Sequence, residues 1–187
     1  MKISVKNAYL VCSIIFLIYL FLPNPDLPEP TSDSLQSNEP ADIETSLRRG
    51  YYTDQSRADV LTHYQLEFSR SAFFNMPLPT YRLNYPPEEA QTLIRDQARS
   101  TFLEEIVHPF RESLFVNGFE PKEDKDAIVV NGKKWNQKII VRFVPSNRVV
   151  RSSIGIVVLL LIYVLIFQWK SALAGIVQAA NEKIFPK

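Results

Sequence analysis

The chain has 187 residues, and its 21 Lys and Arg nearly balance its 20 Asp and Glu, so a net charge of +1 argues against a strongly basic nucleic-acid binder. A single cysteine, Cys12, excludes an internal disulfide framework, and two histidines exclude a three-histidine metal site. With 5 glycines and neither a GxGxxG nor a GxxxxGKS/T motif, we expect no glycine-rich phosphate loop.

The first apolar segment, residues 8–22, follows a short tail, residues 1–7, that carries two lysines. The 19 residues between Lys6 and Asp26 are uncharged. As a helix they reach about 28 Å, close to the ~30 Å hydrocarbon core of a bilayer. A cleaved signal peptide is the alternative, but no small-residue cleavage site follows, so we expect an uncleaved transmembrane signal anchor. We expect Cys12 to be an apolar filler of this helix rather than a palmitoylation site.

Residues 23–47 differ from both neighbours because they contain five prolines, six acidic residues and no basic residue. Few apolar side chains are available to offset the conformational entropy of the chain, so the composition predicts an extended, mobile linker. Such a linker is a tether that lifts the next domain off the membrane. The alternative is that its acidic side chains bind a basic partner.

The composition of residues 48–151 is typical of one small domain with many aromatic residues. Residues 50–53 suit a short strand. A pattern close to a capping box begins at Ser56, and the apolar spacing after it predicts a helix over 56–70. The proline-rich segment 75–87 forbids a helix and favours an edge strand, a polyproline-like arm or an ordered loop.

Helical spacing then extends from Pro86 and Pro87 to His108. Pro109 is expected to break that helix, and one or two further turns are expected to end at Gly118.

The clearest local signal is the pair Asn131-Gly132, which lies between β-forming residues and predicts a two-residue hairpin turn with positive φ at both positions. A strand is predicted over 138–144, ending before Pro145. The predicted fold class is α+β: a small two-layer extracytoplasmic domain, with helices on an antiparallel sheet, between two transmembrane helices.

The second apolar segment covers residues 152–169, which are 18 uncharged residues between Arg151 and Lys170. We expect a transmembrane helix, because a domain of this size cannot bury a helix that is apolar on every side. The tail 170–187 follows. Four small residues on it are candidates for packing against other membrane helices: Ala172, Ala174, Gly175 and Ala179.

The charges that flank the apolar segments predict the orientation. Lysines lie in both terminal tails, whereas the segment after the first helix is acidic. Both termini are therefore predicted in the cytoplasm and residues 23–151 outside, in a two-pass protein of the plasma or inner membrane. Arg148 and Arg151 argue against this orientation, because they lie on the outer flank of the second helix.

Patterns that would support catalysis or metal binding are weak. Glu105 and His108 form a Glu-x-x-His motif, but di-metal sites need two such motifs and further acids, so we expect an ordinary helix face. His63 lacks a nucleophile elbow nearby, and we expect it to be structural. The sequence therefore predicts no enzyme activity, no cofactor and no metal.

Six residues are candidates for partner binding. The hairpin combines lysines with a tryptophan, which suits an anionic lipid, a glycan or a protein, although lysines on a strand edge also prevent sheet-to-sheet pairing. The proline-rich arm adds two tyrosines. The candidates are Lys133, Lys134, Trp135, Lys138, Tyr81 and Tyr85.

These features together predict a structural, assembly or interaction component of a cell-envelope protein complex. Its expected partners are other membrane or envelope proteins, the lipid bilayer or a second copy of the chain, and not nucleic acid. An extracytoplasmic sensor or ligand-binding module that relays through the second helix is the alternative. A membrane-tethered hydrolase is the third hypothesis.

Overall fold

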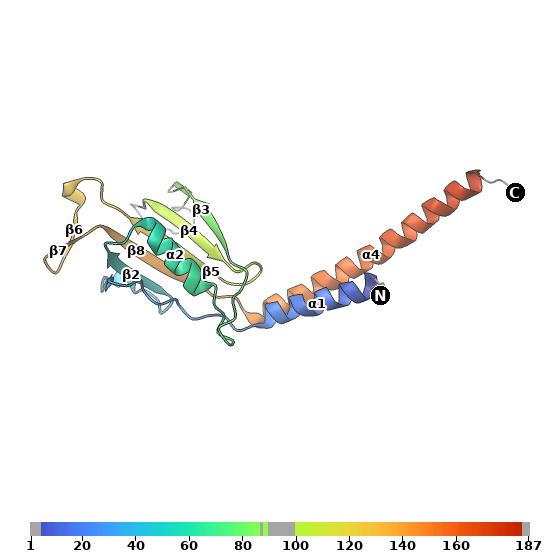
Figure 1. Cartoon of the computed structure of the whole chain (residues 1–187), viewed down its shortest axis with the longest axis horizontal. Coiled ribbons are helices and arrows are strands. Elements are labelled where there is room, and N and C mark those ends of the chain that lie inside the picture. Colours follow the sequence, from blue (N-terminus) through green and yellow to red (C-terminus); the bar gives the residue numbers. More distant parts are fainter. Residues whose placement is uncertain (1–4, 87, 90–99, 185–187) are drawn as a thin grey trace. The chain divides into compact units, whose positions relative to one another are not determined.

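The computed structural model describes residues 5–86, 88–89 and 100–184 (Figure 1). The chain divides into two compact units. One is an α+β domain, residues 22–146, and the other is a helical unit made of residues 1–21 and 147–187. The α+β class and the antiparallel sheet agree with the sequence prediction.

The domain is built on a six-stranded sheet with the order β1-β2-β8-β5-β4-β3, in which every neighbouring pair is antiparallel. The edge strands are therefore β1 and β3, and the long strand β8 lies near the centre. The strands are β1 (Leu35–Gln36), β2 (Arg48–Thr53), β3 (Tyr81–Tyr85), β4 (Phe102–Val107), β5 (Ser113–Phe119) and β8 (Gln137–Val144).

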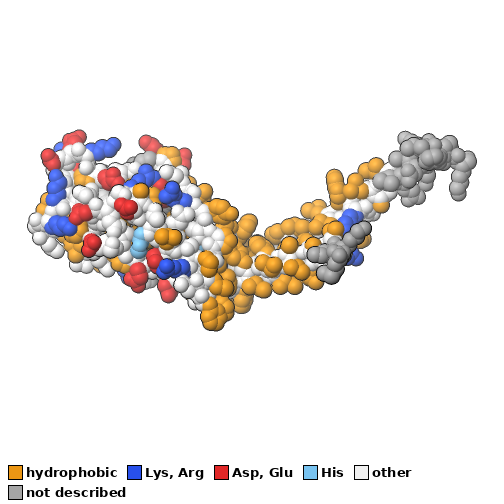
Figure 2. Space-filling model, viewed as in Figure 1, with side chains coloured by type: hydrophobic (Ala, Val, Ile, Leu, Met, Phe, Trp, Pro, Cys, Tyr) orange, Lys and Arg blue, Asp and Glu red, His pale blue; other side chains and the backbone are white. Residues whose placement is uncertain are grey.

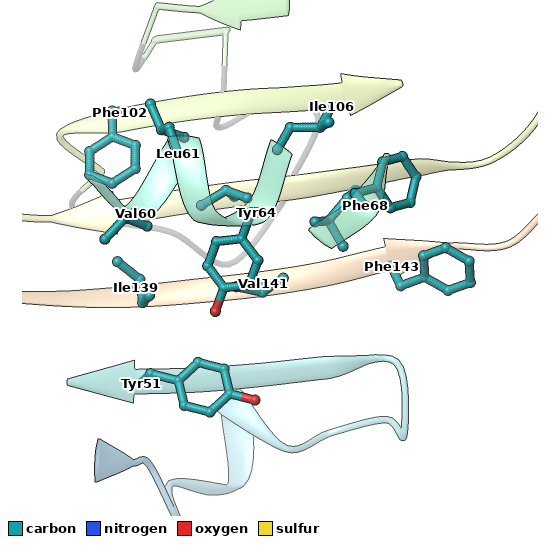
Figure 3. Packing of buried hydrophobic residues seen from close by; sticks show 12 residues of the cluster. Tyr51, Val60, Leu61, Tyr64, Phe68, Phe102, Ile106, Ile139, Val141 and Phe143 are labelled. Atoms are coloured by element: carbon teal, nitrogen blue, oxygen red, sulfur yellow. The ribbon is translucent and has the colours of Figure 1, made fainter. Parts of the chain in front are cut away.

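One face of this sheet is covered by α2 (Arg57–Phe68), which confirms the predicted helix. The Ser56 hydroxyl caps its first turn by accepting a hydrogen bond from the backbone N–H of Asp59, at 3.3 Å. The buried side chains of α2 interdigitate with alternate residues of four strands (Figure 3). The core consists of Tyr51, Val60, Leu61, Tyr64, Phe68, Phe102, Ile106, Leu114, Val116, Ile139, Val141 and Phe143.

The predicted hairpin is confirmed. Strands β6 (Ile128–Val130) and β7 (Lys133–Trp135) form a separate two-stranded sheet. Asn131 and Gly132 between them have φ values of 53° and 76°, the left-handed conformation that a two-residue turn of this type requires.

The helix predicted from Pro86 and Pro87 is helical at the described residues 88 and 89, but its continuation through His108 and on to Gly118 is wrong, because residues 102–107 and 113–119 are strands. Glu104 hid the strand pattern in the sequence. It is a charged residue on the face of β4 that α2 covers, where an alternating strand pattern would have an apolar residue. Glu104 is 1% exposed, and its carboxylate forms an ion pair with Arg57 of α2. The predicted helical residues 87 and 90–99 lie outside the described part of the chain.

Gly118 does not end a helix. It lies within β5, where an added Cβ would be 1.8 Å from a ring atom of Phe102, so the glycine allows close packing of that ring. Pro109 interrupts the regular secondary structure as expected, but it does so in a tight turn between two strands rather than at the end of a helix. In this turn the backbone N–H of His108 donates to the carbonyl of Glu112, at 3.0 Å.

The segment 23–47 contributes structure to the domain. Strand β1 pairs with β2, a 3-10 turn forms at Pro40–Asp42, and the side chains of Leu27 and Leu47 pack against the core. Three of its polar residues are buried: Thr31, Ser37 and Asp42. The structure therefore places much of the predicted mobile linker against the sheet, where these contacts offset its ordering entropy.

The helical unit consists of α1 (Val5–Phe21) and α4 (Arg148–Ile184). Asn147 caps α4 by accepting hydrogen bonds from the backbone N–H groups of residues 149 and 150. Within the described residues, one helix is long and apolar enough to cross a membrane, namely α4 over Arg148–Ile176. Helix α1 is apolar but has 17 residues, about 25 Å, so the two-span prediction is supported for one helix only.

Candidate membrane and partner interfaces

One face of α1 packs against one face of α4, and a glycine allows the close approach. A Cβ added at Gly155 would lie 2.4 Å from Cδ1 of Leu20. Closer to the start of α1, Oη of Tyr9 donates a hydrogen bond to the carbonyl of Leu159, and the rings of Tyr9 and Tyr163 lie 5.9 Å apart. The two helices are therefore antiparallel and in contact along most of α1.

Arg151 of α4 binds the last turn of α1 at one end of this helix pair. Its side chain is buried, and its Nε donates a 2.6 Å hydrogen bond to the carbonyl of Leu20 in the last turn of α1. The last carbonyls of a helix lack partners within the helix, and a cation there interacts favourably with the helix dipole. At the other end of the pair, Lys6 and Lys170 line the same hollow between the helices.

Most other apolar side chains of the helical unit point outward. The exposed large hydrophobic residues between Ile154 and Trp169 are 41 to 68% exposed, and hydrophobic side chains run along both helices (Figure 2). Soluble proteins rarely leave a continuous apolar surface of this kind in water. A surface of this kind is typical of a contact with lipid or with another protein chain.

The small residues of the predicted packing surface also lie on α4. Ala172, Ala174 and Gly175 are exposed, and a Cβ added at Gly175 would meet nothing within 4 Å. Ala179 lies on the same helix, in the portion whose side chains the structure does not describe. The described part of this surface is thus accessible to another chain.

The candidate tyrosines lie on β3, which among the described residues pairs only with β4. Tyr81 and its neighbour Leu83 are 60% and 46% exposed, on the sheet face opposite α2. Oη of Tyr85 donates to Glu105 at 2.7 Å, and this hydrogen bond together with burial raises the pKa of Tyr85 to about 12. An edge strand leaves one row of backbone N–H and C=O groups for an incoming strand.

The lysines of the hairpin are paired locally. Nζ of Lys133 lies 3.7 Å from the ring centroid of Trp135 and 2.7 Å from Asp54, and its hydrogen bond lowers the pKa of Asp54. Nζ of Lys134 lies 3.0 Å from Asp124. These exposed pairs are weak, but their acidic partners offset the positive charge expected for a lipid-binding or glycan-binding patch.

Lys138 is engaged inside the domain. Its ammonium lies 2.8 Å from Glu39 and 2.7 Å from the buried Asp42, while Oη of Tyr52 donates to Glu39 at 2.6 Å. Burial opposes the charged form of Lys138, but the hydrogen bonds to Asp42 and Glu39 outweigh it and raise its pKa. Hydrogen bonds from Lys138 and Tyr52 lower the pKa of Glu39. This cluster fixes the segment before β2 to β8, and sequence reasoning missed it because its members lie up to 99 residues apart.

A second buried network was also missed. Nδ1 of His108 lies 3.0 Å from Oε1 of Glu112, and Nη2 of Arg111 lies 2.7 Å from the same oxygen and donates to the carbonyl of Pro23 at 2.8 Å. The His108 ring stacks on Phe68 with centroids 4.1 Å apart. Burial favours the protonated form of Glu112, but the hydrogen bonds from His108 and Arg111 outweigh it and lower the pKa of this carboxyl. The sequence signal that could have indicated this network is the close spacing of a histidine, an arginine and a glutamate within residues 108–112.

The weak chemical motifs are separated in space. Glu105 bonds Tyr85 on one side of the sheet, whereas His108 stacks on the α2 side, so the two residues do not converge on a metal. Nε2 of His63 lies 2.9 Å from the carbonyl of Glu29. Across residues 5–86, 88–89 and 100–184, no group of three or more His, Cys, Asp or Glu side chains is placed to hold a metal ion.

Comparisons with protein-family models, with curated proteins and with solved structures found no match to this chain. The functional argument therefore depends on the contacts and surfaces described above.

Proposed function

We propose that this chain is a non-enzymatic, membrane-anchored component of a cell-envelope protein complex, in which the α+β domain binds a protein partner. The observation that carries the proposal is the outward apolar surface of α4. Helix α1 covers only one side of α4, and the remaining surface needs lipid or other membrane helices. In this proposal α1 and α4 form a two-pass hairpin with both termini in the cytoplasm.

Charge at the two ends of the helix pair supports this orientation. Lys6 and Lys170 lie together at one end, as expected for a cytoplasmic boundary. Arg151, at the other end, has a local role because it caps α1. The position of Arg151 is therefore no evidence against an extracytoplasmic location of the domain.

The orientation is tested by thiol labelling of the full chain in a C12S background. A cysteine at Asn131, on the exposed turn of the hairpin, should react in intact cells or spheroplasts with a membrane-impermeant maleimide. A cysteine at Ser171 should react only after the membrane is permeabilised. The reverse pattern would place the domain in the cytoplasm and refute the orientation.

The surface proposed for the protein partner is the edge of β3 that pairs with no other strand among the described residues. Tyr81 and Leu83 present apolar side chains beside backbone groups that an extended segment can pair with. Two carboxylates at these positions should repel such a segment and leave the domain folded, because both side chains are exposed.

The partner experiment compares Y81E/L83E with V129E, a control at an exposed apolar position of the hairpin. Each full-length protein is cross-linked in membranes, gently solubilised and purified. We expect co-purifying envelope chains with the wild type and with V129E, and their loss with Y81E/L83E. Recovery of the wild type alone, as a monomer, would refute the assembly role.

The sensor hypothesis is the alternative, and one observation favours it. Strand β8 ends at Val144 and α4 begins at Arg148, so only residues 145–147 connect the sheet to the helix. Within the domain, Asn24 also donates to the carbonyl of Ser146, the residue at which the domain ends, at 2.9 Å. A thermal shift of the full chain with envelope glycans, lipids or metal ions would favour the sensor.

A further inference from the structure

Large apolar side chains are exposed at one end of the α+β domain. The loop after α2, residues 70–77, presents Phe73 (45% exposed), Phe74 (83%) and Met76 (38%), and the turn between β4 and β5 presents Phe110 (77%). These four residues are called the aromatic end below. Figure 2 shows hydrophobic side chains gathered toward one end of the domain, whereas acidic and basic side chains lie over the rest of the visible face.

Hydrogen bonds hold the loop of the aromatic end in shape. The backbone N–H of Ser71 donates to the carbonyl of Met76, and the Ser71 hydroxyl donates to the carbonyl of Phe73, both at 2.9 Å. Phe74 and Phe110 have φ values of 53° and 61°, a backbone conformation that bulky residues rarely adopt. Strain of this kind clusters at active sites, ligand clamps and switch regions.

The chain enters and leaves the domain at this same end. The ring of Phe68, the last residue of α2, stacks on the ring of His108, which begins the turn between β4 and β5. In that turn Arg111 donates to the carbonyl of Pro23, the second residue of the domain, and Asn24 donates to the carbonyl of Ser146, its last residue. These contacts link the aromatic end to both junctions with the helical unit.

Only a short stretch of chain separates the last residue of the domain from the apolar part of α4. Ser152, the first residue of the uncharged part of α4, is six residues after Ser146. Four of these residue steps lie in α4 and rise about 6 Å, and the two before it span at most about 7 Å, so the separation is at most about 13 Å, while the headgroup layer of a bilayer is about 5–7 Å thick. Aromatic side chains tethered this closely to the hydrocarbon are within reach of the lipid interface.

We propose that the aromatic end inserts Phe73, Phe74 and Phe110 into the lipid interface, so that the bilayer surface is the partner of this end of the domain. The inference rests on the proposed membrane anchor and adds a second contact between the domain and the membrane. Lipid is favoured over a protein at this end because the short connection to α4 leaves little room for a protein between the domain and the headgroups.

The test uses the full chain reconstituted in liposomes of phosphatidylglycerol and phosphatidylethanolamine. Single nitroxide labels are placed at F74C, F110C, V129C and L160C in a C12S background. The V129C label is the water-exposed control on the hairpin, and the L160C label is the lipid-exposed control on α4. Collision rates with oxygen, which concentrates in lipid, and with a water-soluble nickel chelate are then compared, after circular dichroism has shown that each variant is folded.

We expect the labels at positions 74 and 110 to collide more with oxygen than with nickel, as at position 160, and the label at 129 to give the reverse ratio. A water-like ratio at 74 and 110 with a lipid-like ratio at 160 would overturn this inference and leave the anchor standing. Low collision rates with both reagents at 74 and 110 would indicate burial in protein and would also overturn it. A water-like ratio at 160 would overturn the proposed anchor and this inference together.

Discussion

Replacing Glu112 by glutamine should destabilise the domain more than removing any single exposed ion pair. The carboxylate is buried and accepts from both His108 and Arg111, so E112Q removes the negative charge that faces the buried guanidinium. Removing one partner of a buried ion pair costs roughly 3–5 kcal/mol, and the amide retains one acceptor, so we expect a loss of about 3 kcal/mol. For a unit of this size that loss lowers the melting temperature by about 10 °C.

The pH dependence of this effect follows from the lowered pKa of Glu112. The folded protein binds fewer protons at this carboxyl than the unfolded chain, so the carboxylate's contribution is complete above the ordinary value of 4.5. The contribution is lost as the pH falls through the lower folded-state pKa. Because E112Q lacks this contribution at every pH, the gap in stability between wild type and variant should narrow below about pH 4.5.

The assay is thermal unfolding of the full chain in detergent micelles, followed by near-ultraviolet circular dichroism and by the fluorescence of the buried Trp135. E123Q is the matched control, because Glu123 and its partner Lys125 are both exposed, and its effect should be within about 0.5 kcal/mol. A loss below about 1 kcal/mol for E112Q, or a gap that stays constant from pH 7 to pH 4, would refute the reasoning.

Three further predictions concern stability and packing. Y64F should raise stability by about 1 kcal/mol in the same melting assay, because the buried Tyr64 hydroxyl has no hydrogen-bond partner among the described residues, and removing the hydroxyl ends that penalty. D42N should lower stability by about 2–4 kcal/mol by leaving Lys138 without its buried partner. An unchanged melting temperature would contradict a stabilising role of the ion pair between Lys138 and Asp42. G155I should reduce bismaleimide cross-linking between cysteines on α1 and α4, whereas G155A should not, because the flexible end of Leu20 can move aside for one methyl group but not for a larger side chain.

The parts of the fold that local chemistry determines were predicted from the sequence. Ser56 caps α2 within its own first turn, and Asn131-Gly132 adopts positive φ without help from distant residues. The run that forms β8 is rich in β-branched residues and ends at Pro145. In each case the signal and the structure that it determines lie within a few residues of one another.

The parts that failed depend on partners far along the chain. Glu104 lies on the core face of β4 because Arg57, 47 residues earlier, neutralises it, and no local pattern identifies that pairing. Asp42 is buried because Lys138 reaches it from β8, so composition alone indicated a solvated linker. The candidate lysines likewise looked free in the sequence, although folding pairs each of them with an acid.

Arg151 illustrates how one contact changes the interpretation of a charge pattern. From the sequence alone, an arginine on the outer flank of the second apolar segment opposes a cytoplasmic C-terminus. In the folded unit its guanidinium is buried against the last turn of α1, where a cation binds an orphan carbonyl and interacts favourably with the helix dipole. The arginine therefore lies at this end to join the two helices, which is a requirement of packing. Arg148 is exposed at the same end and still argues against a cytoplasmic C-terminus, whereas the lysines at 6 and 170 line one hollow at the opposite end and are the charges that the proposed hairpin places in the cytoplasm.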